Sequence, residues 1–339
     1  MSFFGLDIGS SSFKVTQVTK MGSSFGIDAI GAIVNPISSV DFSDVTLKQR
    51  ASDALKKLLS EMGMKERRVV LGISESKVFS RVVSMPAMSD AELASAINWE
   101  AEQFVPMPIA EVEMDYSIVR RPLSEATDQT MLVYLLASPK KYLEEVLNFA
   151  VGVGLEPIAI ESEMVGVSRS LTYGGLSGTS ILVNIGATAS TIAIVDGDSL
   201  LFSYVFPVGG FAMSRALAQS LSFPLPQAEE YKRTYGLDGR QFEGKVKTAL
   251  LVVINSLVGD LRKAIEYHTA QYKTAVVRIM LVGGGAYLPE LTTYLSGEFP
   301  GIEVSVADPF LKSKSAKRVN LPSDRASYAV AVGLALREF

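Results

Sequence analysis

The residues best suited to chemistry lie in a short turn close to the N-terminus. In GLDIGSSSFK, residues 5–14, an apolar stretch is followed by a carboxylate, a glycine and three hydroxyls. Glycine lets backbone amides approach a ligand closely, and successive amides with serine hydroxyls form a concavity that binds anions. The turn is therefore suited to holding a phosphate. The residues that would form this site are Asp7, Gly9, Ser10, Ser11 and Ser12.

Two further glycine-rich turns also follow apolar stretches. VNIGATAS comes about 177 residues after the first turn, and the triplet Gly283–Gly285 follows about 97 residues later. Like turns half a chain apart indicate a duplication, and one turn from each half could hold a polyphosphate from opposite sides. The triplet suits close approach to a base or sugar, or an anion at a helix N-terminus. Neither GxxxxGK[ST] nor GxGxxG is present, which excludes the common phosphate motifs.

Composition narrows the class of protein. The chain has 339 residues, 48% of them apolar and 20% charged, as expected of a folded protein with more than one core. A net charge of −4 argues against a nucleic-acid surface. Without cysteine there is no thiolate metal site, and His268 alone makes neither a zinc site nor a Ser-His pair persuasive. No run is apolar for ~18 residues and no signal peptide is evident, so we expect a cytoplasmic protein that reaches a membrane through a partner.

The first 76 residues predict an α/β unit that positions the first turn. FFGLDIG, FKVTQVTK and FGIDAIGAIV alternate as strands of a meander, with turns at Gly-Ser-Ser and Met-Gly-Ser-Ser. A helix is predicted near Val45–Met62, followed by the strand RVVLGIS. The order of a helix and a further strand after a meander is typical of an α/β unit.

Residues 77–157 predict a separate small module. VFSRVVSMP is a strand, and Ser89 with Glu92 forms a capping box that opens a helix to about Phe104. VEMDYSIV and TMLVYLLAS are strands on either side of the polar loop SEATDQ. A second helix begins after Ser138, and LEPIAIE returns as a strand. The order β-α-β-β-α-β predicts a split α/β sandwich, whose Trp99 and Phe104 we expect in its core.

The second half repeats the N-terminal pattern. SILVNIGATASTIAIV aligns with MSFFGLDIGSSSFKVTQV, and LFSYVFPVGG follows. Helices are predicted at Phe211–Leu221 and across Gln227–Tyr272. A strand, a helix and a further strand are then predicted at RIMLVGGGAYL, PELTTYLSGEF and IEVSVADPF, respectively. The last sixteen residues, DRASYAVAVGLALREF, predict a closing amphipathic helix.

The order of these turns resembles the actin/Hsp70/sugar-kinase superfamily. Within it, GLDIGSSSFKV, the early insertion, PVGG, AEEYKRTYG and LVGGGAYLPEL resemble the PilM family of type IV pilus assembly proteins. The resemblance covers the whole chain and implies an α/β fold of duplicated actin-like (ribonuclease H-like) domains with a β-α-β-β-α-β insertion. It implies a domain 1A of residues 1–76, 158–178 and 324–339, a subdomain 1C of 77–157, a domain 2A of 179–215 and 276–323, and a subdomain 2B of 216–275.

The resemblance also implies a site for ATP and Mg²⁺. Asp7 would hold Mg²⁺ through waters, and Glu161 is a candidate to orient the attacking water. The β- and γ-phosphates would face Gly9, Ser10, Ser11, Ser12 and Lys14 on one side and Asn184, Gly186, Ala187 and Thr188 on the other. The nucleoside would contact Gly209, Gly210, Glu229, Lys232, Gly283, Gly284, Gly285 and Tyr287.

Asn184 departs from the superfamily pattern, which commonly has a second aspartate at this position. An amide cannot act as a base and attracts the Mg²⁺ shell less strongly than a carboxylate. A simple turn role, in which Asn184 satisfies local amides, is compatible with this reading. We therefore expect ATP binding with slow or no hydrolysis.

The function implied by the resemblance is that of an ATP-binding scaffold on the cytoplasmic face of the inner membrane. It would bind the N-terminal peptide of the single-pass partner PilN in a groove between the first domain and the insertion. Contacts with assembly ATPases or the platform protein, and a homo-oligomer, are further expectations.

Two alternatives use the same fold. A small-molecule kinase needs a catalytic aspartate in a substrate cleft, and the insertion offers Asp115, which alternates as a strand-face residue in MDYSIV. An FtsA-like membrane-associated polymer would end in a linker and a basic amphipathic helix, whereas this sequence ends at LALREF, within the predicted closing helix.

Overall fold

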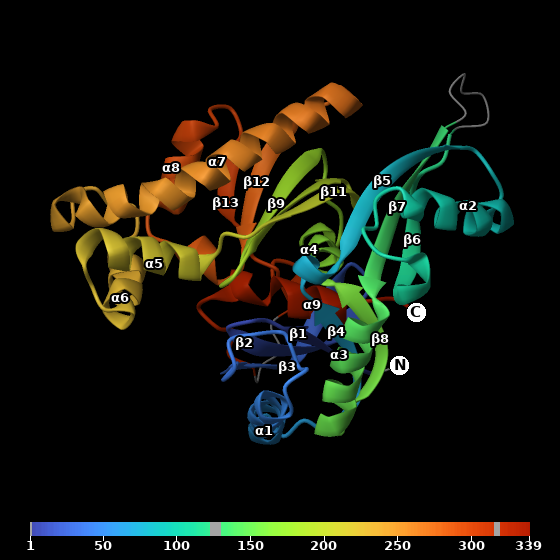
Figure 1. Cartoon of the computed structure of the whole chain (residues 1–339), viewed down its shortest axis with the longest axis horizontal. Helices are drawn as coiled ribbons and strands as arrows, with labels where there is room; N and C mark the ends of the chain where they lie inside the picture. The colour runs from blue at the N-terminus through green and yellow to red at the C-terminus, as the bar shows by residue number, and fades with distance from the viewer. Residues whose placement is uncertain (1, 123–129, 315–318) are drawn as a thin grey trace.

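Two sheets of matching topology form the body of the molecule (Figure 1). The computed structural model describes residues 2–122, 130–314 and 319–339. The first sheet has the order β14-β3-β2-β1-β4-β8 and the second the order β11-β10-β9-β12-β13. In each sheet an antiparallel meander precedes parallel strands, so β1 and β9 occupy equivalent central positions. The duplicated α/β fold expected from the sequence is confirmed.

The first sheet places the first turn at the end of its central strand. Alternating apolar residues make β1 and β2 an antiparallel hairpin in which Asp7 lies opposite Lys14. The turn between them, residues 9–11, is therefore fixed by its flanking strands. The strands are β1 (Phe4–Ile8), β2 (Ser12–Met21), β3 (Ser24–Val34), β4 (Arg68–Ile73), β8 (Glu156–Ser162) and β14 (Ser313–Lys314).

The second sheet places the second turn in the same way. Asn184 lies opposite Thr191 in the hairpin of β9 and β10, and the apolar side chains of β9 are buried on both faces. The strands are β9 (Thr179–Ile185), β10 (Ser190–Asp196), β11 (Ser199–Phe206), β12 (Val276–Val282) and β13 (Glu303–Val306).

Helices cover the outer faces of both sheets, and two of them cross between the halves. In Figure 1, α5 to α7 extend away from the second sheet, and α1 and α3 lie beside the first sheet. The helices are α1 (Val45–Glu61), α2 (Asp90–Glu102), α3 (Lys140–Val153), α4 (Glu163–Thr172), α5 (Gly210–Leu221), α6 (Leu225–Tyr235), α7 (Lys245–Tyr272), α8 (Leu291–Glu298) and α9 (Ala329–Ala335). Short 3-10 turns are η1 (Glu75–Lys77), η2 (Ile109–Glu111), η3 (Phe242–Gly244), η4 (Gly284–Tyr287) and η5 (Arg325–Tyr328).

The crossing of α4 and α9 depends on two glycines in contact. An added Cβ at Gly333 would lie 1.7 Å from the Gly166 carbonyl oxygen, closer than any atom can approach. Every residue of α9 is buried. The prediction of an amphipathic helix over the last sixteen residues is therefore wrong. Helix α9 is shorter than predicted, and it has no solvent-facing side because it packs between the two halves.

The inserted module is smaller than the predicted 77–157. Its sheet has the order β5-β7-β6, with strands β5 (Phe79–Pro86), β6 (Val112–Arg120) and β7 (Thr130–Pro139). The capping box of Ser89 and Glu92 is confirmed at the start of α2. Helix α3, however, buries Val146 and Phe149 in the core of the first sheet, and β8 pairs with β4. The final helix and strand of the predicted sandwich thus belong to the first domain.

Other predicted domain boundaries also differ from those in the structure. The division between 215 and 216 falls inside α5, and β14, predicted within domain 2A, pairs with β3 of the first sheet. In the inserted module, Phe104 packs against the core, whereas Trp99 is 75% exposed, so its predicted core position is wrong. The predicted polar loop SEATDQ lies outside the described residues. Within the described residues, no helix is both long enough and apolar enough to span a membrane.

Candidate functional site

A cavity of about 550 Å³ lies between the two halves, a size typical of small-ligand sites. It is lined by the β1–β2 and β9–β10 turns, the N-terminal turn of α5, one face of α6 and the glycine triplet. The three glycine-rich turns read from the sequence therefore open into one space. Of the predicted contacts, Glu161 and Gly209 do not line it.

The first hairpin presents a carboxylate and an ammonium group to the cavity. Lys14 Nζ lies 3.7 Å from Asp7 Oδ2 and donates a hydrogen bond of 2.8 Å to Ser12 Oγ. Burial raises the pKa of Asp7 above its ordinary value, and the neighbouring Lys14 ammonium opposes this shift. A cation at this position would favour the ionised carboxylate.

The second hairpin meets the first across the cleft. Ser10 Oγ and Thr188 Oγ1 lie 3.2 Å apart although 178 residues separate them in the chain. The Gly186 amide donates to the Ala189 carbonyl oxygen within its own turn, so this predicted phosphate donor is already paired. The carbonyl oxygens of Gly186 and Ala187 accept from the first amides of α5. The hairpin is therefore held rigidly against that helix.

Gly209 contributes by permitting this close packing. An added Cβ at Gly209 would lie 2.7 Å from the carbonyl oxygens of Gly186 and Ala187. Gly209 therefore supports the second hairpin from outside the cavity, and its neighbour Gly210 lines the cavity.

The glycine triplet packs against the end of β9. Gly283 has a φ of +81°, and an added Cβ there would lie 2.5 Å from Asn184 Oδ1. Only glycine fits both the left-handed backbone and this contact. Beyond the triplet, Tyr287 accepts a hydrogen bond of 3.0 Å from the Ala326 amide, which fixes its ring at the rim of the cavity.

The pair on α6 forms a polar cluster with the start of α5. Lys232 Nζ lies 2.7 Å from Glu229 Oε2 and donates to Ser214 Oγ and the Gly210 carbonyl oxygen, each at 3.0 Å. Burial favours the neutral form of Glu229, but hydrogen bonds from Lys232 and Ser214 outweigh it and lower its pKa. The ammonium group of Lys232 is thus directed to one wall of the cavity, where its partners hold it in place.

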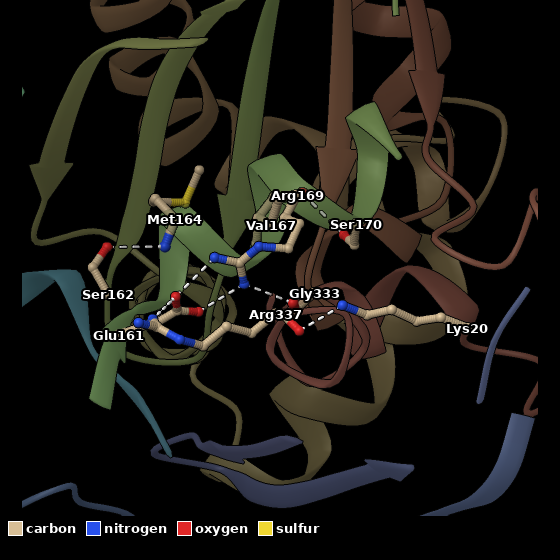
Figure 2. A network of polar contacts seen from close by, with 9 residues as sticks. All are labelled: Lys20, Glu161, Ser162, Met164, Val167, Arg169, Ser170, Gly333 and Arg337. Atoms are coloured by element: carbon tan, nitrogen blue, oxygen red, sulfur yellow. Dashed lines mark hydrogen bonds and ion pairs between the residues drawn. The ribbon is translucent and has the colours of Figure 1, made fainter. Parts of the chain in front are cut away.

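Glu161 has a different environment from the one predicted (Figure 2). Arg169 donates two hydrogen bonds of 2.7 Å to its carboxylate, and Arg337 forms an ion pair with it. Arg169 also donates to the Gly333 carbonyl oxygen, which joins β8, α4 and α9. Glu161 lies outside the cavity and both of its carboxylate oxygens are engaged, so its carboxylate does not reach a water in the cavity. It is placed instead to stabilise the crossing of α4 and α9.

Glu163, two residues further on, is the acid that the sequence reading missed. It is the first residue of α4, it lines the cavity, and its Oε1 accepts a hydrogen bond of 3.1 Å from the Glu75 amide. Burial, with the nearby carboxyls of Glu75 and Asp7, raises the pKa of Glu163 to about 8. A carboxyl with such a pKa exchanges protons near neutral pH, as a general acid or base must. The signal available in the sequence was its position as the first residue of a helix that follows a strand.

Replacing Glu163 by glutamine is expected to flatten the pH dependence of stability. The pKa is raised from 4.5 to about 8 in the folded protein. The stabilising contribution of such a group is complete below the unfolded-state pKa and is lost as the pH rises through the folded-state value. Urea unfolding should therefore show that wild type loses on the order of 4 kcal/mol of stability between about pH 5 and about pH 9, and that Glu163→Gln does not. Identical pH profiles for the two proteins would contradict this assignment.

The donor set fits a magnesium–nucleotide complex. Asp7 supplies one carboxylate, and the described residues contain no group of three or more acidic, histidine or cysteine side chains that could hold a metal by themselves. Mg²⁺ commonly keeps several waters and binds through one or two carboxylates together with phosphates. The cavity offers the carboxylate of Asp7, with a lysine and two hydroxyl-bearing turns beside it where phosphates could bind.

Comparison with known proteins agrees with this arrangement. The family described as "Type IV pilus assembly protein PilM" matches residues 5–339. The chain belongs to the PilM family. The structure titled "PilM-PilN type IV pilus biogenesis complex" has a TM-score of 0.85 and 27% identity, covering 99% of this chain and 98% of that one.

More distant structures share the fold with this PilM family member. The ethanolamine utilization protein EutJ from Carboxydothermus hydrogenoformans has a TM-score of 0.60 at 18% identity, covering 99% of this chain and 89% of that one. MreB 5 of Spiroplasma citri bound to AMPPNP has a TM-score of 0.54 at 14% identity, covering 98% and 94%. At these identities the likeness supports the actin-like fold alone.

Proposed function

We propose that the cavity binds ATP with Mg²⁺ and that the protein acts as a scaffold of type IV pilus assembly. The observation that carries the nucleotide site is the contact of Ser10 with Thr188, which places the two duplicated turns on opposite sides of one space. MreB 5 of Spiroplasma citri, which shares this fold, is bound to AMPPNP, and we extend a ligand of that class to this cavity. The family match supports the assembly role.

Each wall of the cavity has a distinct role in this proposal. The phosphates lie between residues 9–12 with Lys14 and residues 186–188, where hydroxyls, the lysine and turn amides other than that of Gly186 donate to them. Asp7 would hold Mg²⁺, which would neutralise charge at the phosphates. Glu229 and Lys232 contact the ribose or base, with Gly283–Gly285 and Tyr287 closing the adenosine side.

Hydrolysis is slow in this proposal. Asn184 lines the cavity where a second carboxylate would serve, and its amide neither accepts a proton nor adds negative charge near Mg²⁺. Glu163 is the acid positioned to orient a water, in place of Glu161. At neutral pH its raised pKa keeps much of it protonated, which leaves less of the basic form.

The partner in this proposal is a PilN-like peptide. The most similar structure cited above is titled as a PilM–PilN complex, and we place the corresponding peptide in a groove between the first domain and the inserted module. Binding to a single-pass protein would hold the scaffold at the cytoplasmic face of the inner membrane. Assembly ATPases, the platform protein and further copies of this chain are additional proposed contacts.

The kinase alternative is not supported by the site. Asp115 lies exposed on β6 and does not line the cavity. The FtsA-like alternative has no favouring observation, because the family match is to PilM across residues 5–339.

Three measurements test the proposal. Mg-ATP at about 100 times its Kd should stabilise the protein by about 2.7 kcal/mol in thermal unfolding, and an immobilised PilN-like N-terminal peptide should capture it. ATP turnover should be slow and indifferent to added sugars or acids. Rapid turnover that appears only with such a substrate would overturn the scaffold and favour a kinase.

A further inference from the structure

A buried carboxyl joins both halves of the molecule and the inserted module. Glu75, on the turn η1 after β4, is 2% exposed. Its Oε2 accepts a hydrogen bond from Ser162 at the start of α4, and its Oε1 accepts one of 2.7 Å from Ser203 on β11. Ser203 lies 128 residues away, in the second half, so one side chain bridges the two halves.

The chain of hydroxyls continues into the inserted module. Ser80 Oγ on β5 lies 2.7 Å from Ser203 Oγ, and the Tyr134 hydroxyl on β7 lies 3.2 Å from it. Since Ser203 donates to Glu75, it is free to accept from Ser80 and Tyr134. Within the described residues, the groups that shift the pKa of Glu75 include no lysine or arginine, so hydroxyl and amide donors alone compensate this buried carboxyl.

The same residue reaches the nucleotide cavity through its backbone. The Glu75 amide donates to Glu163 Oε1 at 3.1 Å. Ser162, which Glu75 holds, accepts from the Met164 amide at 3.2 Å and caps the helix that Glu163 begins. The position of the Glu163 carboxyl therefore depends on Glu75 in two ways, through the Glu75 amide and through the Ser162 cap, beside a hydrogen bond with the Thr191 side chain.

We infer that Glu75 is a positioning residue, which sets Glu163 in the cavity, and that Glu75 and Ser203 together transmit nucleotide occupancy to strands β5 and β7 of the inserted module. The inference rests on the proposed nucleotide site. A ligand that contacts Glu163 changes the hydrogen bond that the Glu75 amide donates to Glu163. The side chain of Glu75 in turn accepts a hydrogen bond from Ser203, so a shift of Glu75 reaches Ser203. Hydrogen bonds in a low-dielectric interior couple strongly, which makes this chain of contacts a physical path between the two sites.

Hydrogen–deuterium exchange with and without Mg-AMPPNP tests the path, and calorimetry measures binding separately. In wild type, Mg-AMPPNP should slow exchange in β5 and β7 at least about two-fold. Ser203→Ala should abolish that slowing while its Kd for Mg-AMPPNP stays within about three-fold of wild type. Glu75→Ala should lose the slowing as well, and Glu75→Gln, which keeps two hydrogen bonds, should retain it.

Ser180→Ala is the matched control. Ser180 is a buried serine of β9 that accepts a hydrogen bond from Arg278, away from the cavity, and its replacement should leave the slowing intact. Slowing in Ser203→Ala equal to that in wild type would overturn the inference, as would binding by wild type without any slowing. Failure of wild type to bind Mg-AMPPNP would overturn the nucleotide proposal and this inference together. If Glu75→Ala does not fold, Ser203→Ala still decides.

Discussion

Replacing Gly333 by alanine is expected to lower the free energy of unfolding by about 3 kcal/mol, at the upper end of overpacking costs. The added Cβ would lie 1.7 Å from the carbonyl oxygen of Gly166 and 2.8 Å from its Cα. These are backbone atoms of a buried helix, so no side-chain rotation can relieve the overlap. Helices α4 and α9 must move apart, and buried contacts between the halves are lost. Urea unfolding followed by circular dichroism measures the change.

Gly259→Ala gives the matched control for this experiment. Gly259 is a helix-interior glycine of α7, and an added Cβ there meets nothing within 4 Å. Alanine is favoured over glycine in helices by about 0.5–1 kcal/mol, so this variant should be slightly more stable than wild type. If both variants matched wild type in stability, the close crossing of α4 and α9 would not exist in solution.

The crossing helices also carry the site. Glu163 begins α4, and Arg169 of the same helix donates to both Glu161 and the Gly333 carbonyl oxygen. A shift of α4 therefore displaces Glu163 within the cavity. Gly333→Ala should weaken binding of Mg-ATP as well as the fold.

The second large effect is expected for Asp7→Asn, whose Kd for Mg-ATP should rise about 10- to 100-fold. The amide keeps the shape of the carboxylate but carries no charge for the magnesium shell. Isothermal titration with Mg²⁺ should show this loss, whereas titration of ATP in the presence of EDTA should give similar Kd values for both proteins. The dependence on magnesium separates a metal role from general damage to the cavity.

The ligand-free fold should tolerate Asp7→Asn. Burial raises the pKa of Asp7, so ionising this carboxyl costs stability, and that cost appears as the pH rises through the folded-state value. Asparagine has no such ionisation, so its melting temperature near neutral pH should not fall on this account. Asp28→Asn, at an exposed position of β3 in the same sheet, is the control and should bind Mg-ATP as wild type does. Equal Mg-ATP binding by Asp7→Asn would remove Asp7 from the metal site.

The two hairpin turns that line the cavity were predictable because their signals are local. Alternating apolar residues around Ile-Gly steps define two hairpins, and the repeat about 177 residues apart predicts that the halves share a topology. The sheet orders confirm this. The glycine triplet was likewise readable, since Gly283 has a backbone conformation that other residues rarely adopt.

The acid in the cavity was not predictable from the same kind of signal. Glu161 and Glu163 both lie where β8 passes into α4, and either could face a ligand when the sequence alone is considered. Arg169 and Arg337 decide between them, because they engage Glu161 from α4 and from beyond α9. Arg337 lies 176 residues from Glu161 in the chain.

The sequence alone determined the paired turns, the duplication and the pilus family, since each depends on short motifs and on their order along the chain. Tertiary structure decided that α3 and β8 complete the first domain, that α9 is buried on every side, and that Glu163 lines the cavity. It also decided that Glu75 meets Ser203. Those outcomes depend on which strand pairs with β4 and which side chains meet across the halves. Such contacts join residues distant in the chain, and short-range periodicity carries no information about them.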